Sequence, residues 1–242
     1  MNDEALFRVV RERPLASRFS VSFRRLCVGT AILALSVGAA VADQPAAPAP
    51  ASPPATVVAP DVTVPLDQLM ASGPLPDIVQ GSASAPVTII EYASMTCSHC
   101  AAFHDSTWPE LKSKYIDSGK AKFILREFPL DPLATAAFML ARCAGPEKRN
   151  LLIDQLFTQQ KTWAFVDKPI APLLAMVKTV GFTQADFEKC LRDPDLYEQV
   201  SQSREHAAEA FNIDSTPTFF INGHKLTGEL TIVDFDKAIE PH

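Results

Sequence analysis

Apolar and polar positions from residue 77 onward predict a strand, a helix and a second strand in succession. The run 87–92 is apolar and rich in β-formers, as expected of a strand that is covered on both faces. A helix is predicted over about 97–118, with a kink at Pro109 because proline lacks the amide proton that its turn requires. A second buried strand is predicted over 121–128, and 77–79 predicts a short edge strand.

A block of about 80 residues with helical character follows these strands. Three helices in it have a start signal. In each, a residue that can cap the first turn is followed by a proline or, three positions later, by an acid. The signals are Asp131 with Pro132, Thr183 with Asp186, and Asp193 with Pro194. The buried stripe of the first helix is predicted to consist of Leu133, Ala137, Leu140 and Ala144.

The chain returns to a strand pattern after this block. Residues 218–221 are apolar, Asn222 and Gly223 form a two-residue hairpin turn, and 224–226 pairs back. A helix over about 231–239 follows. This order of elements predicts an α/β domain that is interrupted by inserted helices. The two halves of the domain are predicted at 77–130 and 213–242, and the insertion at 131–212.

The N-terminal part of the chain carries a secretion pattern. Two arginines precede an uncharged apolar run, 26–41, which ends in small residues. This pattern predicts a signal peptide over 1–42, cleaved after Ala42, and therefore an exported, periplasmic protein. The run of 16 residues is shorter than the roughly 20 that span a bilayer core. Retention of the run as an N-terminal membrane tether stays open as an alternative.

Residues 43–76 are predicted to form a disordered linker. Ten of the 20 prolines of the chain lie between residues 45 and 86, mostly in a sequence rich in alanine, proline and serine. Such a sequence has neither helical nor strand periodicity and stays extended without packing a core.

Charge and cysteine content narrow the class of protein. The net charge is −6, and the first 42 residues carry +3, which leaves −9 from residue 43 onward. An acidic protein repels phosphate backbones, so nucleic acid is not an expected partner. Of the five cysteines, Cys27 lies in the predicted signal peptide. Cleavage leaves an even set of four in a compartment where disulfides persist.

The sequence Cys97-Ser98-His99-Cys100 lies after the strand 87–92 and at the start of a helix, which is the setting of a redox dithiol. At the first helical turn, a Cys97 thiolate meets unpaired backbone N–H groups and the positive end of the helix dipole. His99 can add a donor or a positive charge. Cys97 is therefore expected to be the good leaving group in disulfide exchange. Cys100, one turn deeper, is expected to be the resolving thiol.

Two metal-binding alternatives use the same cysteines. A structural zinc site could use Cys97, Cys100 and His104, but no further cysteine or histidine supplies a clear fourth ligand. The dithiol could also hold copper or another soft metal, because thiolates suit such ions. We expect no metal, and no cofactor other than the redox-active disulfide of Cys97 and Cys100.

Cys143 and Cys190 are 47 positions apart in the predicted insertion, each on the apolar face of its helix. We hypothesise that they form a structural disulfide, which loop-closure entropy would make worth about 4 kcal/mol. The alternative is a pair of buried free thiols.

The segment 91–100, the helical insertion and Thr216–Pro217 together resemble the DsbA family of exported thiol-disulfide oxidoreductases, over about residues 77–240. The resemblance implies a thioredoxin-like fold with a helical insertion domain. It also implies that Thr216–Pro217 is a cis dipeptide that contacts the dithiol and binds an extended substrate. Glu91 matches the buried acid of the family, which relays a proton to or from Cys100. The next strand offers three further candidates for this proton network, namely Lys122, Arg126 and Glu127.

The resemblance further implies a dithiol oxidase that donates disulfides to reduced or unfolded exported proteins and is reoxidised by a membrane quinone-linked partner. Two departures keep a disulfide isomerase or reductase open as an alternative. Ser98 stands where the family commonly has proline, and Thr216 also occurs before the cis-proline of isomerases and reductases. Residues 43–76 do not resemble the dimerisation domain of periplasmic isomerases, so we expect a monomer.

Overall fold

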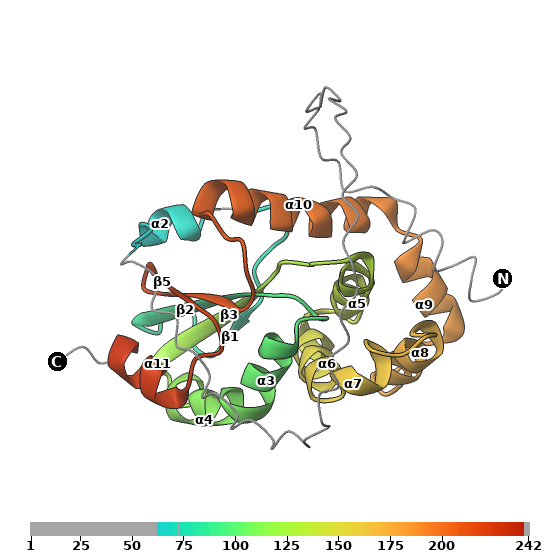
Figure 1. Cartoon of the computed structure of the whole chain (residues 1–242), viewed down its shortest axis with the longest axis horizontal. Coiled ribbons are helices and arrows are strands. Elements are labelled where there is room, and N and C mark those ends of the chain that lie inside the picture. The colour runs from blue at the N-terminus through green and yellow to red at the C-terminus, as the bar shows by residue number, and fades with distance from the viewer. Residues whose placement is uncertain (1–61, 72, 240–242) are drawn as a thin grey trace, which may run out of the picture. The chain divides into compact units, whose positions relative to one another are not determined.

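A computed structural model describes residues 62–71 and 73–239, which contain a mixed five-stranded sheet (Figure 1). The strand order is β1-β3-β2-β4-β5, with β2 and β3 parallel and the other neighbours antiparallel. The two halves predicted at 77–130 and 213–242 both contribute strands, so the predicted α/β arrangement with inserted helices is confirmed. The strands are β1 (Val79–Gln80), β2 (Val87–Ala93), β3 (Ala121–Glu127), β4 (Thr218–Ile221) and β5 (His224–Thr227).

The long helix predicted after β2 is divided into three parts. Helix α3 spans Ser98–Ser106, α4 spans Trp108–Leu111, and one π-helical turn, η1, spans Lys112–Ile116. Pro109 occupies the first turn of α4, where the N–H that it lacks has no partner within the helix. The predicted kink is therefore confirmed, and it lies at Thr107, between α3 and α4.

Residues 131–212 contain six helices, and the three predicted start signals act as caps. The Asp131 side chain accepts a hydrogen bond from Ala134 N, and Thr183 and Asp186 form a full capping box. Asp193 accepts hydrogen bonds from two backbone N–H groups of the last inserted helix. The inserted helices are α5 (Pro132–Cys143), α6 (Pro146–Thr158), α7 (Gln160–Trp163), α8 (Ile170–Lys178), α9 (Gln184–Leu191) and α10 (Pro194–Phe211), and α11 (Ile232–Ile239) follows β5.

Residues 62–71 pack onto the sheet, which corrects part of the linker prediction. Val64 N donates a hydrogen bond to Gly223 O at 2.9 Å. Helix α2 (Leu66–Leu69) buries Leu69 completely. A Cβ atom on Gly223 would collide with the Val64 carbonyl oxygen, so the turn glycine permits this approach. The disorder predicted up to residue 76 is wrong for this segment, because its apolar side chains find a buried surface.

Strand β2 alternates its side chains between two cores on opposite faces of the sheet. Ile89 and Ala93 belong to the core that includes side chains of α3, α4 and α11. Ile90 and Tyr92 belong to a second core with side chains of α2 and α10. Figure 1 shows the same layers, with α2 and α10 on one side of the sheet and α3, α4 and α11 on the other. Glu91 shares the parity of Ile89 and Ala93, so its side chain points toward α3.

The C-terminal end of α10 belongs to the second core of the sheet. Ala207 and Phe211 are buried there with Ile90 and Phe220. The predicted boundary of the insertion at residue 212 therefore needs correction, because α10 begins among the inserted helices and ends against the sheet. All the described residues belong to one compact unit.

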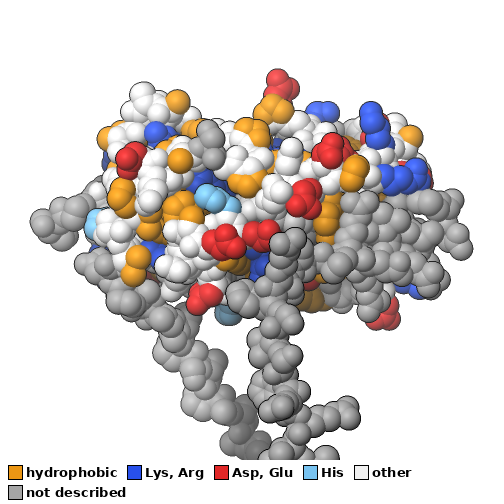
Figure 2. Space-filling model, turned by 90° about the horizontal axis from the view of Figure 1, so that it is seen from above, with side chains coloured by type: hydrophobic (Ala, Val, Ile, Leu, Met, Phe, Trp, Pro, Cys, Tyr) orange, Lys and Arg blue, Asp and Glu red, His pale blue; other side chains and the backbone are white. Residues whose placement is uncertain are grey.

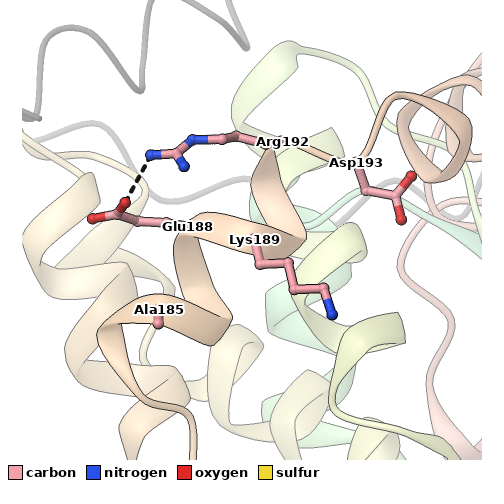
Figure 3. Close-up of a pocket in the computed structure, with 5 residues that line it drawn as sticks. All are labelled: Ala185, Glu188, Lys189, Arg192 and Asp193. Carbon is pink, nitrogen blue, oxygen red and sulfur yellow. Dashed lines mark hydrogen bonds and ion pairs between the residues drawn. The ribbon is translucent and has the colours of Figure 1, made fainter.

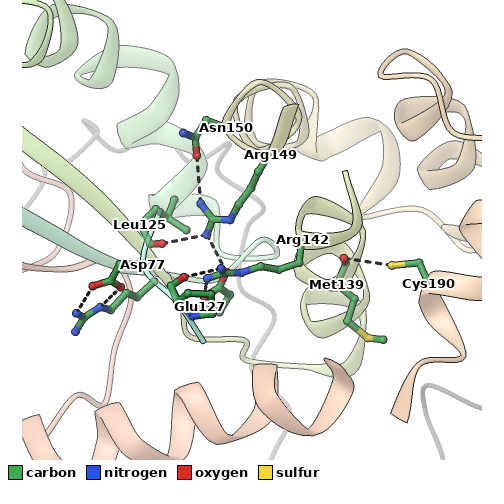
Figure 4. Close-up of polar contacts among 10 residues, drawn as sticks. Asp77, Leu125, Glu127, Met139, Arg142, Arg149, Asn150 and Cys190 are labelled. Carbon is green, nitrogen blue, oxygen red and sulfur yellow. Dashed lines mark hydrogen bonds and ion pairs between the residues drawn. The ribbon is translucent and has the colours of Figure 1, made fainter. Parts of the chain in front are cut away.

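A buried ion network joins β3 to the inserted helices α5 and α6 (Figure 4). Arg142 donates to both carboxylate oxygens of Glu127, at 2.7 and 2.9 Å, and Arg149 donates to Oε1 at 2.8 Å. Arg149 is fully buried and Glu127 is 1% exposed. Burial alone would raise the Glu127 pKa, but the charges of Arg149 and Arg142 outweigh it and hold the pKa at about 2.

The structure joins Cys143 of α5 to Cys190 of α9 by a disulfide, with a Cα–Cα distance of 6.2 Å. Cys190 is buried, whereas Cys143 is exposed. The disulfide hypothesis therefore holds in this structure, while the expected burial is found at one of the two positions. The bond links the first and the fifth of the six inserted helices.

The surface above α10 carries both signs of charge. Figure 2 shows acidic and basic side chains together with scattered hydrophobic ones on the visible part of this face. A nucleic-acid-binding surface is typically basic throughout.

Within residues 62–71 and 73–239, no helix has the length and apolarity that crossing a bilayer requires. The predicted signal peptide over 1–42 and the linker up to residue 61 lie outside the described residues.

Candidate active site

The two cysteines of the predicted dithiol lie at the N-terminus of α3. Cys97 is the N-cap residue, with extended backbone angles, and Cys100 lies in the first turn. The Cys97 residue is 9% exposed and Cys100 is completely buried. Both are free thiols in this structure. One sulfur therefore lies near the surface and the other beneath it, as the sequence predicted.

The Cys97 pKa is lowered from its ordinary value to about 5. The largest cause is a hydrogen bond from the Cys100 side chain, which burial opposes. The Thr216 side chain lowers the pKa further, as do hydrogen bonds from the backbone N–H groups of Cys100 and His99 at the start of the helix. A thiolate at this position is therefore stable at neutral pH.

The Cys100 pKa shifts in the opposite direction. Burial raises it well above its ordinary value, and donation to Cys97 and the negative charge of Glu91 raise it further. Cys100 is therefore a thiol when the pair is reduced. The reduced dithiol therefore holds one negative charge, and the two pKa shifts place that charge on Cys97.

Thr216 and Pro217 lie beside the dithiol although they are far from it in sequence. They directly precede β4, which pairs with β2, the strand that leads to Cys97. The Thr216–Pro217 peptide bond is cis. The Cys97 thiol donates to the Thr216 carbonyl oxygen, with 3.2 Å between the sulfur and the oxygen. The structure thus brings the predicted substrate-binding dipeptide into contact with the predicted reactive cysteine.

The His99 ring is exposed and lies against Glu229. Its Nδ1 atom lies 3.5 Å from Glu229 Oε2, and its side chain is 70% exposed. The contribution of His99 to the thiolate comes from its backbone N–H group. The sequence placed this residue correctly at the helix start, but the predicted influence of its ring is not among the main causes of the low Cys97 pKa.

Glu91 is completely buried on the face of β2 that faces α3. Burial raises its pKa, and the neighbouring Cys97 charge raises it further, whereas His104 lowers it. Glu91 Oε2 lies 2.9 Å from His104 Nε2, and Glu91 Oε1 has no hydrogen-bond partner. The predicted acid therefore lies where expected, and its partner is a histidine of the redox helix.

His104 lies one helical turn after Cys100 on α3 and is almost completely buried. Its Nδ1 atom lies 3.5 Å from Asp154 Oδ1, on the inserted helix α6. Burial opposes a charge on the ring, but Glu91 and Asp154 outweigh it and raise the His104 pKa to about 9. The imidazolium is therefore the favoured form at neutral pH.

Gln160 of α7 ties the inserted helices to the loop that carries Cys97. Its buried amide donates two hydrogen bonds, each at 2.9 Å, to the carbonyl oxygens of Met95 and Cys97. Thr96 of the same loop donates to the Asp131 side chain, the cap of α5, at 2.6 Å. The insertion thus fixes the loop before the redox helix from two sides.

The three further candidates for the proton network lie elsewhere. Arg126 donates to both carboxylate oxygens of Asp77 and to Tyr92 Oη, on the face of the sheet opposite Glu91. Lys122 has the same parity as Arg126 and donates to Ala83 O. Glu127 shares the face of Glu91 but is held by two arginines. Each of these three candidates, none of which the sequence favoured individually, thus has another partner in the structure.

The structure gives no support to a metal site. Among residues 62–71 and 73–239, no three His, Cys, Asp or Glu side chains are grouped so that they could hold a metal ion. His104 Nε2 faces Glu91 and not the thiols, contrary to the zinc alternative.

A surface hollow of about 440 Å³ lies over α9 and the start of α10 (Figure 3). It is lined by Ala185, Glu188, Lys189, Arg192 and Asp193, none of which is a predicted site residue.

Sequence reasoning missed Asp154 and Gln160 and considered His104 as a zinc ligand alone. The spacing of Cys100 and His104, four residues on one helix, places both on one face and was the available signal. Asp154 and Gln160 come from inserted helices, and no local pattern shows where these helices meet α3.

Comparisons with known proteins agree with this geometry. The sequence model of the family described as thioredoxin matches residues 75–241. A protein of Rickettsia bellii, provisionally named a protein-disulfide oxidoreductase, is 34% identical over 169 residues, which cover 68% of this chain and 65% of that protein. This chain therefore spans slightly less than two thirds of the length of that relative.

Solved structures give the same result. The crystal structure of alpha-DsbA1 from Wolbachia pipientis is 30% identical, with a TM-score of 0.66, and the match covers 72% of this chain and 93% of that one. Oxidised BdbD from Bacillus subtilis is 18% identical with a TM-score of 0.61, over 74% of this chain and 95% of that one, and shares the fold. From its fold, its dithiol and these matches, the chain belongs to the thioredoxin family and, within it, to the DsbA-like proteins.

Proposed function

We propose that this protein is a thiol-disulfide oxidoreductase that works as a dithiol oxidase and donates the Cys97–Cys100 disulfide to reduced exported proteins. The observation that carries the proposal is the pair of opposite pKa shifts within one dithiol, downward at Cys97 and upward at Cys100. A sulfur that is stable as an anion is a good leaving group. Its buried partner is suited to staying inside the protein as a thiol.

The reaction proceeds in two exchanges. A substrate thiolate attacks the Cys97 sulfur, a mixed disulfide forms, and Cys100 leaves and takes up a proton. A second substrate thiolate then attacks the substrate sulfur of the mixed disulfide, and Cys97 leaves as a thiolate. The substrate gains a disulfide and gives up two electrons. The protein ends with a Cys97 thiolate and a Cys100 thiol.

The low Cys97 pKa also favours this direction of electron flow. The Cys97 pKa of about 5 lies two units below pH 7. At pH 7 its ionisation therefore stabilises the reduced protein by about 3 kcal/mol, relative to a protein whose cysteine stays protonated. At about 30 mV per 1.4 kcal/mol, this makes the disulfide about 60 mV more oxidising. The reduced state is the stabilised one, so the protein tends to give its disulfide away.

Three neighbouring groups have roles in this proposal. Glu91, with its raised pKa and its unpartnered Oε1, supplies the proton that Cys100 takes up. Thr216 and Pro217 bind an extended substrate segment beside Cys97, with which Thr216 is already in contact. The backbone N–H of His99 stabilises the thiolate.

The partners follow from the family resemblance. The substrates are reduced or unfolded exported proteins, the compartment is the periplasm, and a membrane quinone-linked protein restores the disulfide. We propose that the protein is a monomer with no metal and no cofactor. The acidic net charge of −6 supports a partner other than nucleic acid.

The most informative test is equilibration of the full chain with a glutathione redox buffer. We expect a reduction potential of about −210 mV or less negative, which is at least about 60 mV above that of thioredoxin at about −270 mV. A potential near that of thioredoxin would reject the oxidase proposal. It would favour the alternative of an isomerase or reductase that a membrane donor keeps reduced.

A second test uses the cysteines as matched variants. Cys97→Ala should abolish disulfide transfer to a reduced, unfolded test protein. A double variant, Cys143→Ala with Cys190→Ala, should keep it, because that disulfide lies within the inserted helices. Transfer that survives in Cys97→Ala would mean that the chemistry lies elsewhere.

A further inference from the structure

A buried acid that gives away its proton needs a partner for the carboxylate that it becomes. Under the proposed function, Glu91 protonates Cys100 when that sulfur leaves, and both side chains are completely buried. An unpaired carboxylate is strongly disfavoured in such a place. Glu91 Oε1, which has no hydrogen-bond partner, is the oxygen that can carry the exchangeable proton. Oε2 lies 2.9 Å from His104 Nε2.

His104 lies between Glu91 and a second carboxylate from a distant part of the chain. Its Nδ1 atom lies 3.5 Å from Asp154 Oδ1 on α6. The ring stacks on Phe157 of the same helix, with 4.2 Å between the ring centroids. This stacking fixes the orientation of the imidazole: Nε2 is hydrogen-bonded to Glu91, whereas Nδ1 has an ion-pair contact with Asp154 and no hydrogen-bond partner. The Asp154 side chain is 38% exposed and is therefore the end of this row that reaches solvent.

The titratable groups near the imidazole come from three elements. Glu91 belongs to β2 and Asp154 to α6, and Cys97 and Cys100, at the start of α3, interact electrostatically with Glu91. The contact from α4 is aromatic, with the Trp108 ring 5.9 Å from the imidazole. Asp154 is a carboxylate on one side of the ring, and Glu91 becomes one on the other side when it gives up its proton; each carboxylate favours a positive charge on the ring.

We propose that Asp154 and His104 are positioning residues of the exchange reaction, in which Asp154 holds His104 as an imidazolium and the imidazolium stabilises the carboxylate form of Glu91. The inference rests on the proposed function and deepens it. It links an inserted helix to the dithiol chemistry. Asp154 touches neither the substrate nor the sulfurs, so it acts through His104 and Glu91.

The protons and electrons balance over one cycle. When a substrate thiolate attacks Cys97, the bond between the two cysteines breaks and its electron pair goes to the Cys100 sulfur. The proton on Glu91 Oε1 moves to that sulfur, and the new carboxylate is paired with the imidazolium through Oε2. When the dithiol is reoxidised, Cys100 returns the proton to Glu91. The substrate dithiol supplies the two electrons and the reoxidant removes them.

The test is the rate at which dithiothreitol reduces the oxidised full chain, followed by acid quench and alkylation of the new thiols. The rate of Asp154→Asn is divided by that of the wild type at each pH, which cancels the ionisation of dithiothreitol. We expect a ratio close to one near pH 6, where the imidazolium persists in both proteins. We expect it to fall about threefold by about pH 8.5, because removing one carboxylate lowers the His104 pKa by about one unit.

The control is Glu147→Gln, which removes an exposed carboxylate from the first turn of the same helix. Its ratio should stay at one throughout. A ratio for Asp154→Asn that stays at one from pH 6 to 8.5 would overturn the inference, as would an equal fall in both variants. If the wild type itself does not exchange with dithiols, the proposed function fails. An intact exchange with a flat ratio rejects this inference alone.

A second measurement does not depend on turnover. Nuclear magnetic resonance of the reduced protein, in which Glu91 is the carboxylate, follows the titration of the His104 imidazole directly. We expect a midpoint near 9 in the wild type and a midpoint about one unit lower in Asp154→Asn. Equal midpoints in the two proteins would contradict the role given to Asp154.

Discussion

Two buried glutamates on neighbouring parallel strands have opposite pKa shifts. Glu91 on β2 and Glu127 on β3 face the same side of the sheet, and Glu127 is opposite Ala93, two residues beyond Glu91. Burial by itself would raise the pKa of both carboxyl groups. At Glu91 this effect prevails, whereas at Glu127 the arginines reverse it. Both side chains lie on one face of the sheet and are buried, so the difference comes from what the neighbouring helices contribute.

The difference separates a structural charge from a chemical one. Glu127 receives hydrogen bonds from two guanidinium groups, those of Arg142 and Arg149. Glu91 has one titratable partner, His104, and one oxygen without a partner. The first arrangement fixes a carboxylate that joins the sheet to the insertion. The second leaves an acid that can exchange a proton beneath the dithiol.

The largest expected effect is on stability at Glu127. Glu127→Gln should lower the free energy of unfolding by about 3–5 kcal/mol, because it leaves the buried Arg149 charge without its counter-ion. Urea unfolding of the oxidised protein measures this loss. The Cys97 pKa should stay unchanged in the same variant. A loss below about 1 kcal/mol would show that the arginines find other partners.

The next effect is on rate at Glu91. Glu91→Gln keeps the shape of the side chain but cannot supply a proton, so reduction of the disulfide by dithiothreitol should slow about 100-fold. Its stability should change much less than that of Glu127→Gln, since no buried charge loses its only partner. Stopped-flow kinetics and urea unfolding separate the two effects. A wild-type rate in this variant would remove Glu91 from the reaction.

The contributions of Glu127 and of His104 to stability should change with pH in opposite directions. The lowered Glu127 pKa gives stability that is fully present above its ordinary value of about 4.3 and is lost as the pH falls through about 2. The raised His104 pKa gives stability that is fully present below about 6.5 and is lost as the pH rises through about 9.

Each of these groups contributes a slope of up to about 1.4 kcal/mol per pH unit. Unfolding of the oxidised protein measures both slopes without interference from the Cys97 thiolate. Glu127→Gln should flatten the acid slope alone, and His104→Gln the alkaline slope alone. Equal slopes in the wild type and the matching variant would contradict the assignment.

The smallest effect is expected at an exposed ion pair. Glu188 and Arg192 are linked at 2.7 Å on the surface of α9 (Figure 3). Solvent screens such a pair, so Glu188→Gln should leave urea unfolding unchanged within error. A destabilisation comparable to that of Glu127→Gln would show that burial is not what distinguishes the Glu127 network.

Local features of the fold were predictable from the sequence. The caps at Asp131, Thr183 and Asp193 and the hairpin turn at Asn222–Gly223 depend on residues within a few positions of each other. The segment 62–71 was missed because its burial depends on contact with the distant turn at Gly223. Such contacts leave no periodic signal in a short, proline-rich sequence.

In the active site, too, local features were predictable, whereas contacts between distant segments were not. Cys97 and Cys100 are local to one helix start, and Thr216–Pro217 was recognised through the family resemblance. The role of His104 needs Asp154 as well as Glu91, and Asp154 becomes its neighbour through the packing of α6 on α3. The false candidates on β3 arose because the register that pairs Glu91 with Leu125 is not readable from the sequence, although it decides which face Lys122 and Arg126 occupy.

The central claim is that Cys97 carries the negative charge of the reduced dithiol. Ultraviolet absorbance of the thiolate, measured on the reduced full chain against the oxidised one as the pH is raised, tests it most directly. We expect a first ionisation with a midpoint near 5 that disappears in Cys97→Ala. A first ionisation near the ordinary cysteine value of about 8.5, or one that survives in Cys97→Ala, would contradict the account.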